Sequence, residues 1–468
     1  MGLEDLLNES AIRLRIRLGC ALRRSEDGHA LILEIGDGRI VRLSDYVSHY
    51  DAAIDGIANG APLTELRDLV VASGGEWNAI AFLDQVRVLC RTGFVEYPLV
   101  ETGTEYAVIV PQWASFVPSI APRTPPVEDR LQRFACVRRS GNAWLVESPL
   151  CGARLVLADL SALDAPLVRR ALAAAGFLQE ARVENDSCPD ALKLWEFQDL
   201  LFHTHQRRGW HRDMLGAHFP FVGEIDPSPA ERPSWPGKRI RLPRAPVDSG
   251  GESFASVLER RRTVRRFDDS RPISMQELGA LLDRSARIRS ARVVPVATPT
   301  GQSALFEITQ RPYPSAGACH ELEIYPVVAR CADLACGVYH YDASHHSLVR
   351  IPASDADVSR VVADAKRASG DEANPQVVLA IAARFARVMW KYRSIGYGNI
   401  LRNTGALYQT LYLAATELGL SACAIGTGDS ALFARITGLD PLVEGTVGEC
   451  IIGRTLQPDA RSPERDAP

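Results

Sequence analysis

The chain has 468 residues, of which 46% are hydrophobic, so it can bury the cores of about three domains. Its 53 basic and 57 acidic residues leave a net charge of −4, which argues against a general nucleic-acid partner. No uncharged apolar run reaches about 18 residues, and the N-terminus lacks a signal-peptide pattern, so we expect no membrane contact. The ten cysteines form no CxxC pair, which indicates reduced thiols in the cytoplasm.

The first 190 residues contain a degenerate repeat. Each copy begins with short alternating strands around a turn, in residues 17–44 and 133–159. Each copy ends with a helix, a glycine and an aromatic residue, at Gly93-Phe94 and Gly176-Phe177. A glycine that ends a helix and leads into a strand is typical of winged-helix units. We therefore predict winged-helix-like units at residues 1–105 and 106–190.

Residues 191–250 are predicted to form a helical and Pro-rich connecting segment. Its histidines follow no standard zinc spacing, so we predict no metal there and interpret them as part of a lid or substrate channel: His203, His205, His211 and His218. The prolines of residues 225–247 predict an extended backbone that wraps a surface or links domains.

Residues 251–460 are predicted to form an α+β domain. A helix, a basic turn and a second helix opened by Ser274 precede strands at 322–330 and 376–388, a hairpin at 337–351, a long helix at 400–418 and a last strand at 449–454. Gly405 is costly inside that helix, which predicts a neighbour packed closely against it. His345-His346 falls in the hairpin turn, where we expect both rings to be solvated.

Four short motifs in this domain point to a ligand, although each is weak alone. "ERRRTVRRF" (259–267) places five arginines around Thr263, which fits either a solvated charge run or a set of phosphate ligands. "PSAGA" (314–318) is either a turn or a loop that lets backbone approach a flat ligand. Gly426 and Gly428 form a GxG, and Arg454 closes the last strand.

Lys391 and Tyr392 stand side by side between two apolar elements. Such a pair is either a structural rim, with the lysine stem packed along the surface, or a device for proton transfer. The sequence alone leaves both interpretations open.

Taken together and in this order, the motifs resemble a known family. Residues 195–455 are similar to the azoline dehydrogenases of the nitroreductase-like flavoproteins, the oxidases of cyanobactin-type and microcin-type peptide pathways. The resemblance rests on "RRTVRRF", "RPYPSAGA", "WKYRSIGYGNILRNTGALYQTLYLAATELGL" and "IIGR". The N-terminal repeat is similar to the paired leader-peptide recognition units of some of these oxidases. The predicted fold class is thus α+β, with a nitroreductase-like flavin domain preceded by two winged-helix-like units.

The resemblance implies FMN as cofactor and assigns residues to it. The residues that it places at the flavin and its phosphate are Arg261, Arg262, Thr263, Arg265, Ser315, Ala316, Gly317, Gly426, Gly428 and Arg454. It makes Lys391 and Tyr392 the catalytic pair, which takes a proton while a hydride leaves to flavin. A nearby cation such as Arg393 would favour tyrosinate, and the sequence does not tell which of the two is the base.

The resemblance also implies partners. They are a precursor peptide with a leader and an azoline-containing core, a cyclodehydratase, and a second copy of the chain in a homodimer. Two other hypotheses stay open: an NAD(P)H-dependent nitroreductase-type enzyme, and a peptide-binding scaffold that has lost catalysis. The preference for thiazoline or oxazoline also stays open.

Overall fold

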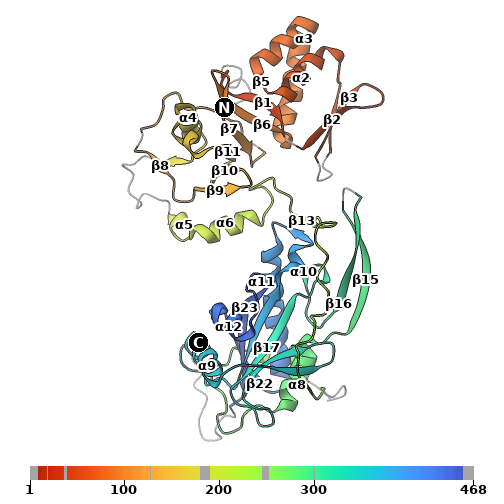
Figure 1. Ribbon diagram of the computed structural model, residues 1–468, viewed down its shortest axis with the longest axis vertical. Coiled ribbons are helices and arrows are strands. Elements are labelled where there is room, and N and C mark those ends of the chain that lie inside the picture. Colours follow the sequence, from red (N-terminus) through yellow and green to blue (C-terminus); the bar gives the residue numbers. More distant parts are fainter. Residues whose placement is uncertain are drawn as a thin grey trace. The chain divides into compact units, whose positions relative to one another are not determined.

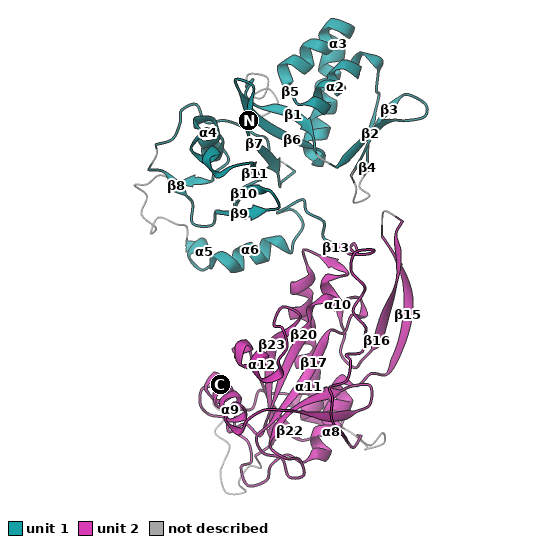
Figure 2. Cartoon of the chain, in the orientation of Figure 1, with its two compact units in different colours: residues 1–215 teal, residues 216–468 magenta. Residues whose placement is uncertain are grey.

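The chain folds into two compact units, residues 1–215 (unit 1) and 216–468 (unit 2) (Figure 2). The computed structural model describes residues 9–17, 19–35, 40–114, 116–126, 128–179, 190–244, 252–298 and 301–456. The boundary between the units falls inside the predicted connecting segment. The predicted start of the flavin domain at residue 251 and its end at 457–460 lie outside the described residues.

Unit 1 is built on a seven-stranded antiparallel sheet in the order β5-β1-β6-β7-β11-β10-β9 (Figure 1). Both sequence repeats contribute strands, because β6 at the end of the first copy and β11 of the second copy both pair with β7 between them. These strands are β1 (Arg13–Ile16), β5 (Ala61–Pro62), β6 (Val95–Glu101), β7 (Thr104–Pro111), β9 (Cys136–Ser140), β10 (Ala143–Glu147) and β11 (Ala153–Leu157). A three-stranded sheet and a two-stranded sheet complete the unit: β2 (Cys20–Arg24), β3 (Ala30–Ile35) and β4 (Ile40–Ser44), and β8 (Arg130–Leu131) with β12 (Leu178–Gln179).

Two helices of unit 1 end at the glycines that the sequence singled out. Gly93 (φ 84°) ends α3, and Gly176 (φ 82°) follows α4, each in the left-handed region that favours glycine. The helices are α2 (Asp51–Asn59), α3 (Leu63–Thr92), α4 (Pro166–Ala174), α5 (Asp190–Lys193) and α6 (Phe197–His205).

Unit 2 has a second seven-stranded sheet, in the order β14-β19-β18-β17-β20-β23-β22 with every pair antiparallel. The strands are β14 (Arg239–Arg241), β17 (Leu322–Val328), β18 (Gly337–Asp342), β19 (Ser347–Ile351), β20 (Val377–Arg384), β22 (Leu420–Ile425) and β23 (Glu444–Arg454). The helices are α7 (Phe254–Arg260), α8 (Met275–Ala286), α9 (Asp355–Ala368), α10 (Phe385–Met389), α11 (Gly396–Glu417) and α12 (Ser430–Thr437). The prediction of an α+β domain is confirmed.

Helices cover both faces of this sheet, which explains why its central strands read as continuous apolar runs. In β20, Leu379 packs in the same core as Leu281 of α8 and Leu407 of α11, whereas Val378 packs in the opposite core with Phe433 of α12. Side chains alternate between the faces of a strand, so a sheet covered on both faces needs apolar residues at every position. As predicted, Ser274 opens α8, where its side chain and that of Glu277 form a capping box.

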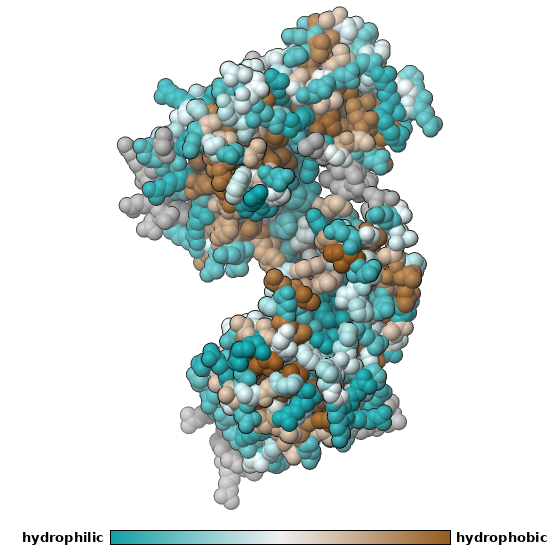
Figure 3. All heavy atoms as spheres, viewed as in Figure 1, coloured by the Kyte–Doolittle hydropathy of each residue, from teal (hydrophilic) through white to brown (hydrophobic). Residues whose placement is uncertain are grey.

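A long two-stranded hairpin, β15 (Ser290–Ala297) with β16 (Ser303–Gln310), extends from unit 2 (Figure 1). Its strands expose Val293 and Leu305 at 57% and 67%. Apolar side chains also lie among polar ones on the visible face of both units (Figure 3). Within the described residues, no helix combines the length and the apolar character that crossing a bilayer requires.

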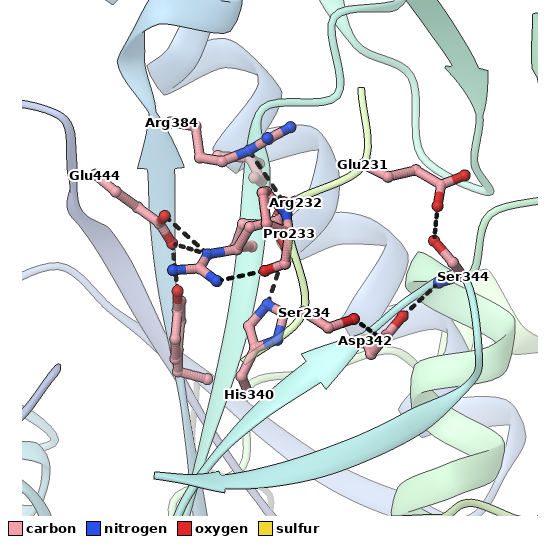
Figure 4. Close-up of polar contacts among 12 residues, drawn as sticks. Glu231, Arg232, Pro233, Ser234, His340, Asp342, Ser344, Arg384 and Glu444 are labelled. Carbon is pink, nitrogen blue, oxygen red and sulfur yellow. Dashed lines mark hydrogen bonds and ion pairs between the residues drawn. The ribbon is translucent and has the colours of Figure 1, made fainter. Parts of the chain in front are cut away.

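The Pro-rich segment lies along unit 2 and is held there by buried polar contacts (Figure 4). Arg232 donates from Nε to Glu444 Oε2 at 3.0 Å, and Ser234 Oγ donates to Asp342 Oδ2 at 3.0 Å. Arg384 of β20 donates to the carbonyl of Ala230 at 2.9 Å. Since proline leaves carbonyls without local donors, arginine side chains from the sheet satisfy them.

Three local predictions were wrong. The strand predicted at 376–388 ends at Arg384, because residues 385–389 turn into α10. A Cβ at Gly405 would meet nothing within 4 Å, so no neighbour in the described chain explains this glycine. His346 is 2% exposed rather than solvated, since its ring contacts Tyr341 Oη at 2.9 Å and the Pro243 carbonyl at 3.1 Å.

Candidate active site

Lys391 and Tyr392 occupy a backbone segment that is fixed on both sides. The segment follows α10, and Tyr392 begins β21 (Tyr392–Arg393), which pairs with β13 (Gly216–Ala217). The Lys391 carbonyl accepts hydrogen bonds from the backbone N–H groups of His218 and Phe219, at 3.0 and 3.2 Å. These bonds set the direction in which the two side chains leave the backbone.

The loop of small residues at 314–318 lies directly against Lys391 and Tyr392. Gly317 (φ 57°), in the 3-10 turn Ala316–Ala318, accepts a hydrogen bond at its carbonyl from Lys391 Nζ at 3.1 Å. A Cβ on Gly317 would stand 2.4 Å from both Lys391 Nζ and Tyr392 Oη. Glycine is therefore required here twice, by its backbone conformation and by the approach of the two polar groups. The fold thus brings together two motifs that are 74 residues apart.

The loop stores backbone strain and is held by a buried polar cluster. Ala318 (φ 54°) and His320 (φ 45°) also adopt left-handed conformations, which are costly for residues other than glycine. Ser315 Oγ accepts from the His320 N–H at 2.9 Å and donates to Glu321 Oε2 at 3.2 Å. Asn403 of α11 accepts from the Ala316 N–H at 3.0 Å and donates to Glu321 Oε1 at 2.9 Å. The Ser315 hydroxyl group thus forms its hydrogen bonds with residues that hold the loop in place.

Glu321 and Arg387 support the site, and our sequence reasoning assigned neither to it. Glu321 is 0% exposed, and burial raises the pKa of its carboxyl group. Arg387 is also 0% exposed and donates to the carbonyls of Cys319, Ser228 and Glu307 at 2.8, 2.7 and 2.8 Å. Charged residues inside the apolar runs "CHELEIY" and "AARFARV" were the available signal, because a charge is buried only where it has partners.

Aromatic rings surround the Lys391 ammonium group. Nζ lies 5.4 Å from the ring centre of Phe306, 5.5 Å from that of Tyr392 and 5.9 Å from that of Phe219. Burial, and then the nearby Cys319, raises the pKa of Tyr392, so the neutral phenol is favoured. The expectation that Arg393 would favour tyrosinate was wrong: neighbours along a strand point to opposite faces, and Arg393 is exposed.

The arginine-rich segment lies at the other end of α11. Thr263 Oγ1 is 3.2 Å from Tyr412 Oη, and the Arg261 guanidinium lies 5.6 Å from the Tyr412 ring centre. Arg262 and Arg265 are exposed, and with Arg261 they make no ion pair with the acidic side chains that the structure describes. Guanidinium groups without an acidic partner are suited to an anion.

Arg454 joins the same end of the unit but is already paired. The Asp268 N–H donates to the Arg454 carbonyl at 3.0 Å, which places the last strand beside the arginine-rich segment. The Arg454 Nη2 donates to Glu277 Oε2 at 2.6 Å, while its Nε is buried without a hydrogen-bond partner among the described residues. Arg454 is therefore held by an acidic partner, and its buried Nε is a donor that no described residue accepts from.

Gly426 and Gly428 follow β22, opposite the middle of α11. Tyr408 Oη donates to the Ile425 carbonyl at 3.0 Å, which ties this turn to the helix. Gly428 N–H donates to Glu449 Oε2 at 3.1 Å, and a Cβ on Gly428 would collide with that carboxyl group. Burial raises the pKa of Glu449 to about 7. A Cβ on Gly426 would meet open space.

Helix α11 therefore contacts three of the predicted motifs. Asn403 contacts the loop at Ser315–Gly317, Tyr408 the glycine turn, and Tyr412 the arginine-rich segment. At about 1.5 Å per residue, Asn403 and Tyr412 are separated by about 13 Å along the helix. Small residues thus stand toward one end of α11 and arginines toward the other, and these are residue types that can contact a flat ring and an anion.

Comparison with known proteins identifies the class. Residues 258–454 match the nitroreductase family. A putative nitroreductase, MJ1384 of Methanocaldococcus jannaschii, is 32% identical over 170 residues, which cover 36% of this chain and 76% of that protein. The fold and the sequence thus define a nitroreductase-type oxidoreductase unit, and the chain belongs to the nitroreductase family.

Two further relatives are named as processing proteins. The trifolitoxin-processing protein TfxB of Rhizobium leguminosarum bv. trifolii is 27% identical over 154 residues, 32% of this chain and 41% of that protein. The microcin B17-processing protein McbC of Escherichia coli is 27% identical over 118 residues, 24% of this chain and 42% of that protein. The matches thus span less than half of either processing protein.

Among solved structures, a putative nitroreductase from Ralstonia eutropha JMP134 aligns with a TM-score of 0.36 and 19% identity, over 53% of this chain and 97% of that chain. The E. coli microcin synthetase McbBCD complex with truncated pro-MccB17 bound aligns with a TM-score of 0.34 and 22% identity, over 42% of this chain and 69% of that chain.

Proposed function

We propose that this protein is an FMN-dependent dehydrogenase that oxidises azolines to azoles in a ribosomally made precursor peptide. The observation that carries the proposal is the contact of Lys391 and Tyr392 with Gly317. It places two proton-carrying groups against the loop that the family resemblance assigns to the flavin face. The similarity to two peptide-processing proteins supports a peptide as substrate.

In this proposal, unit 2 supplies positioning and proton transfer. Arg261, Arg262, Thr263, Arg265 and Arg454 would hold the phosphate of FMN, the loop at Ser315–Gly317 would contact its ring, and Gly426 and Gly428 would also belong to the FMN site. When bound, FMN accepts the hydride that the azoline ring loses. The ring also loses one proton from carbon, so a base on the protein has to receive it.

Lys391 and Tyr392 are the groups that receive this proton. Tyr392 is held as a neutral phenol by burial, so it acts either as a hydrogen-bond donor to the substrate or as a relay. To receive the proton, Lys391 acts as a neutral amine, which donates one N–H to the Gly317 carbonyl and turns the lone pair of Nζ toward the substrate. The Phe306 and Phe219 rings lie beside Nζ, at 5.4 and 5.9 Å from their centres.

Unit 1 is proposed to recognise the substrate peptide. We assign leader binding to winged-helix-like units at 1–105 and 106–190, followed by a connecting segment at 191–250 and the oxidase domain at 251–460. Binding of a leader strand at a sheet edge would raise the local concentration of the core peptide at the oxidase site. A cyclodehydratase that makes the azoline and a second copy of the chain complete the proposed assembly.

A second candidate function is an NAD(P)H-dependent nitroreductase, which the 32% identity to MJ1384 favours. The two candidates differ in the electron donor. We would mix the flavin-loaded protein, without oxygen, with a leader-bearing azoline peptide or with NADPH, and follow the oxidised-flavin absorbance. Bleaching by the peptide supports the dehydrogenase. Bleaching by NADPH alone supports the nitroreductase, and a colourless protein that binds no FMN supports a catalytically inactive scaffold.

The recognition role of unit 1 has its own test. Removal of residues 1–190 should lower activity on a leader-bearing substrate and leave flavin binding unchanged. The matched control is a leaderless azoline peptide, on which the full chain and the shortened chain should be equally active. Equal activity of both chains on the leader-bearing peptide would contradict recognition by unit 1.

A further inference from the structure

A second cluster of chemically active side chains lies in unit 1. Helix α6 ends at His205, and the turn after it brings His211 back, so that the two rings stack with centroids 4.9 Å apart and an interplanar angle of 27°. Asp213 completes the group, and the three potential ligand atoms lie within 4.8 Å of one another. The chain turn explains why the spacing of these histidines does not look like a zinc motif.

The orientation of His211 is that of a metal ligand. Its Nε2 lies 2.7 Å from the His205 carbonyl, which only accepts, so Nε2 carries the proton and Nδ1 presents a lone pair. That Nδ1 is buried and has no hydrogen-bond partner among the described residues. Buried polar atoms without a partner are rare in folded proteins, and an ion is one way to satisfy them. Histidine ligands commonly donate their second N–H to a backbone carbonyl in this way.

The cluster opens onto a cavity of about 410 Å³, which all three side chains line. The charged groups around it are Arg154, whose Nη1 lies 3.4 Å from Asp213 Oδ2, and Arg138, which is paired with Glu147. The 3.4 Å contact is long for a charge-assisted hydrogen bond, so Asp213 is not committed to Arg154. The remaining lining includes Gln198, Ser148 and Trp210.

We propose that His205, His211 and Asp213 bind a divalent transition-metal ion of the zinc class, with one coordination position open to the cavity. Two imidazoles and a carboxylate are the ligand types that zinc prefers, and three protein ligands leave the fourth position for water or a donor group from an entering molecule. Zinc–ligand bonds of about 2.0–2.2 Å place tetrahedral ligand atoms roughly 3.3 Å apart. Binding therefore draws the three side chains closer together than they stand here. The proposal does not depend on the proposed oxidase function.

The test uses the full chain without an affinity tag, stripped of metal with a chelator and titrated with Zn²⁺ against a chromophoric competitor. We expect one Zn²⁺ per chain. Loss of a residue that only hydrogen-bonds to a metal ligand costs about 10–100-fold in affinity, so loss of the ligand itself in His211→Ala should weaken Zn²⁺ binding by at least about 100-fold. The matched control is His203→Ala on the same helix. The His203 ring lies tilted against Trp195 and outside the cluster, so this variant should bind Zn²⁺ as the wild type does.

Two further variants separate loss of a ligand from loss of the fold. His205→Ala and Asp213→Asn should each weaken Zn²⁺ binding while far-UV circular dichroism stays that of the wild type. Co²⁺ bound to the wild type should give the visible absorption of a low-coordinate site, and none of the three variants should give it. Failure of the stripped wild type to bind Zn²⁺ would overturn the proposal, as would stoichiometric binding that survives all three substitutions.

Discussion

The two units differ in what they bury. Among the described residues of unit 1, Glu96 is the one buried side chain that is acidic, basic or a histidine. Arg15 pairs with it at 2.9 Å. Unit 2 buries Asp268, Asp283, Arg311, His320, Glu321, Glu323, His340, Asp342, His346, Arg384, Arg387, Glu444 and Glu449. Burial of a charge costs free energy unless partners compensate for it, so such groups gather where their position is needed.

This contrast indicates a division of labour. Unit 1 has an apolar interior, and its ligand-type side chains face a cavity. Unit 2 uses buried arginines and carboxylates to fix a strained loop under Lys391 and Tyr392. If the buried polar groups of unit 2 fix this loop, substitutions in unit 2 should change stability and activity by graded amounts, from a large effect at Arg387 to a small one at Gly405.

Replacement of Arg387 by Met should give the largest effect. The substitution leaves the buried carbonyls of Cys319, Ser228 and Glu307 without their donor, so we expect a loss of about 3–5 kcal/mol in the free energy of unfolding of unit 2. Urea unfolding followed by circular dichroism measures it. Arg67→Met, at an exposed ion pair of unit 1, is the control and should cost less than about 1 kcal/mol. Equal midpoints for the two variants would contradict the contrast between the units.

Gly317→Ala should act mainly on activity. The added Cβ would displace Lys391 Nζ and Tyr392 Oη, and displacement of about 1 Å at reacting groups lowers turnover by about 100-fold. Rapid mixing with the azoline peptide measures the rate of flavin reduction. Gly370→Ala is the matched control, since Gly370 also has a left-handed backbone (φ 81°) but its Cβ would meet nothing within 4 Å. Equal rates for the two variants would show that the loop contact is not required.

Glu449 should make the stability of unit 2 depend on pH. Burial raises its pKa from about 4.5 to about 7, so between these values the folded state binds more protons than the unfolded state. The free energy of unfolding should therefore fall by about 1–3 kcal/mol as the pH rises from 4.5 to 7. Glu449→Gln should remove this part of the decrease, as seen by urea unfolding at pH 5 and pH 8. If the free energy of unfolding of Glu449→Gln still differs between pH 5 and pH 8 by as much as that of the wild type, a group other than Glu449 causes the pH dependence.

Gly405→Ala should give the smallest effect. Its Cβ would meet open space on α11, so alanine should stabilise unit 2 by about 1 kcal/mol through helix propensity. Thermal unfolding and gel filtration check this. A less stable variant that elutes at a smaller apparent mass would show instead that a second copy packs closely against Gly405.

The sequence predicted most of unit 2 because its elements carry local signals. Ser274 with Glu277 marks a helix start, and the small residues around Gly317 mark a close approach. The contact between Gly317 and Lys391 could not be predicted by spacing, because tertiary packing joins residues 74 positions apart. Arg387 was hidden in an apolar run, and the His205–His211 contact depends on a turn whose path no spacing rule describes.

The most direct test of the central claim is single-turnover flavin reduction by the azoline peptide in Lys391→Ala, Tyr392→Phe and wild type. Lys366→Ala, at a half-buried lysine of α9 that bonds to Asn374, serves as control. If the pair transfers the substrate proton, both site variants should keep bound FMN and reduce it at least about 100-fold more slowly, while the control keeps the wild-type rate. Reduction at the wild-type rate in Lys391→Ala and Tyr392→Phe would contradict the assignment of this pair as the proton-transfer groups.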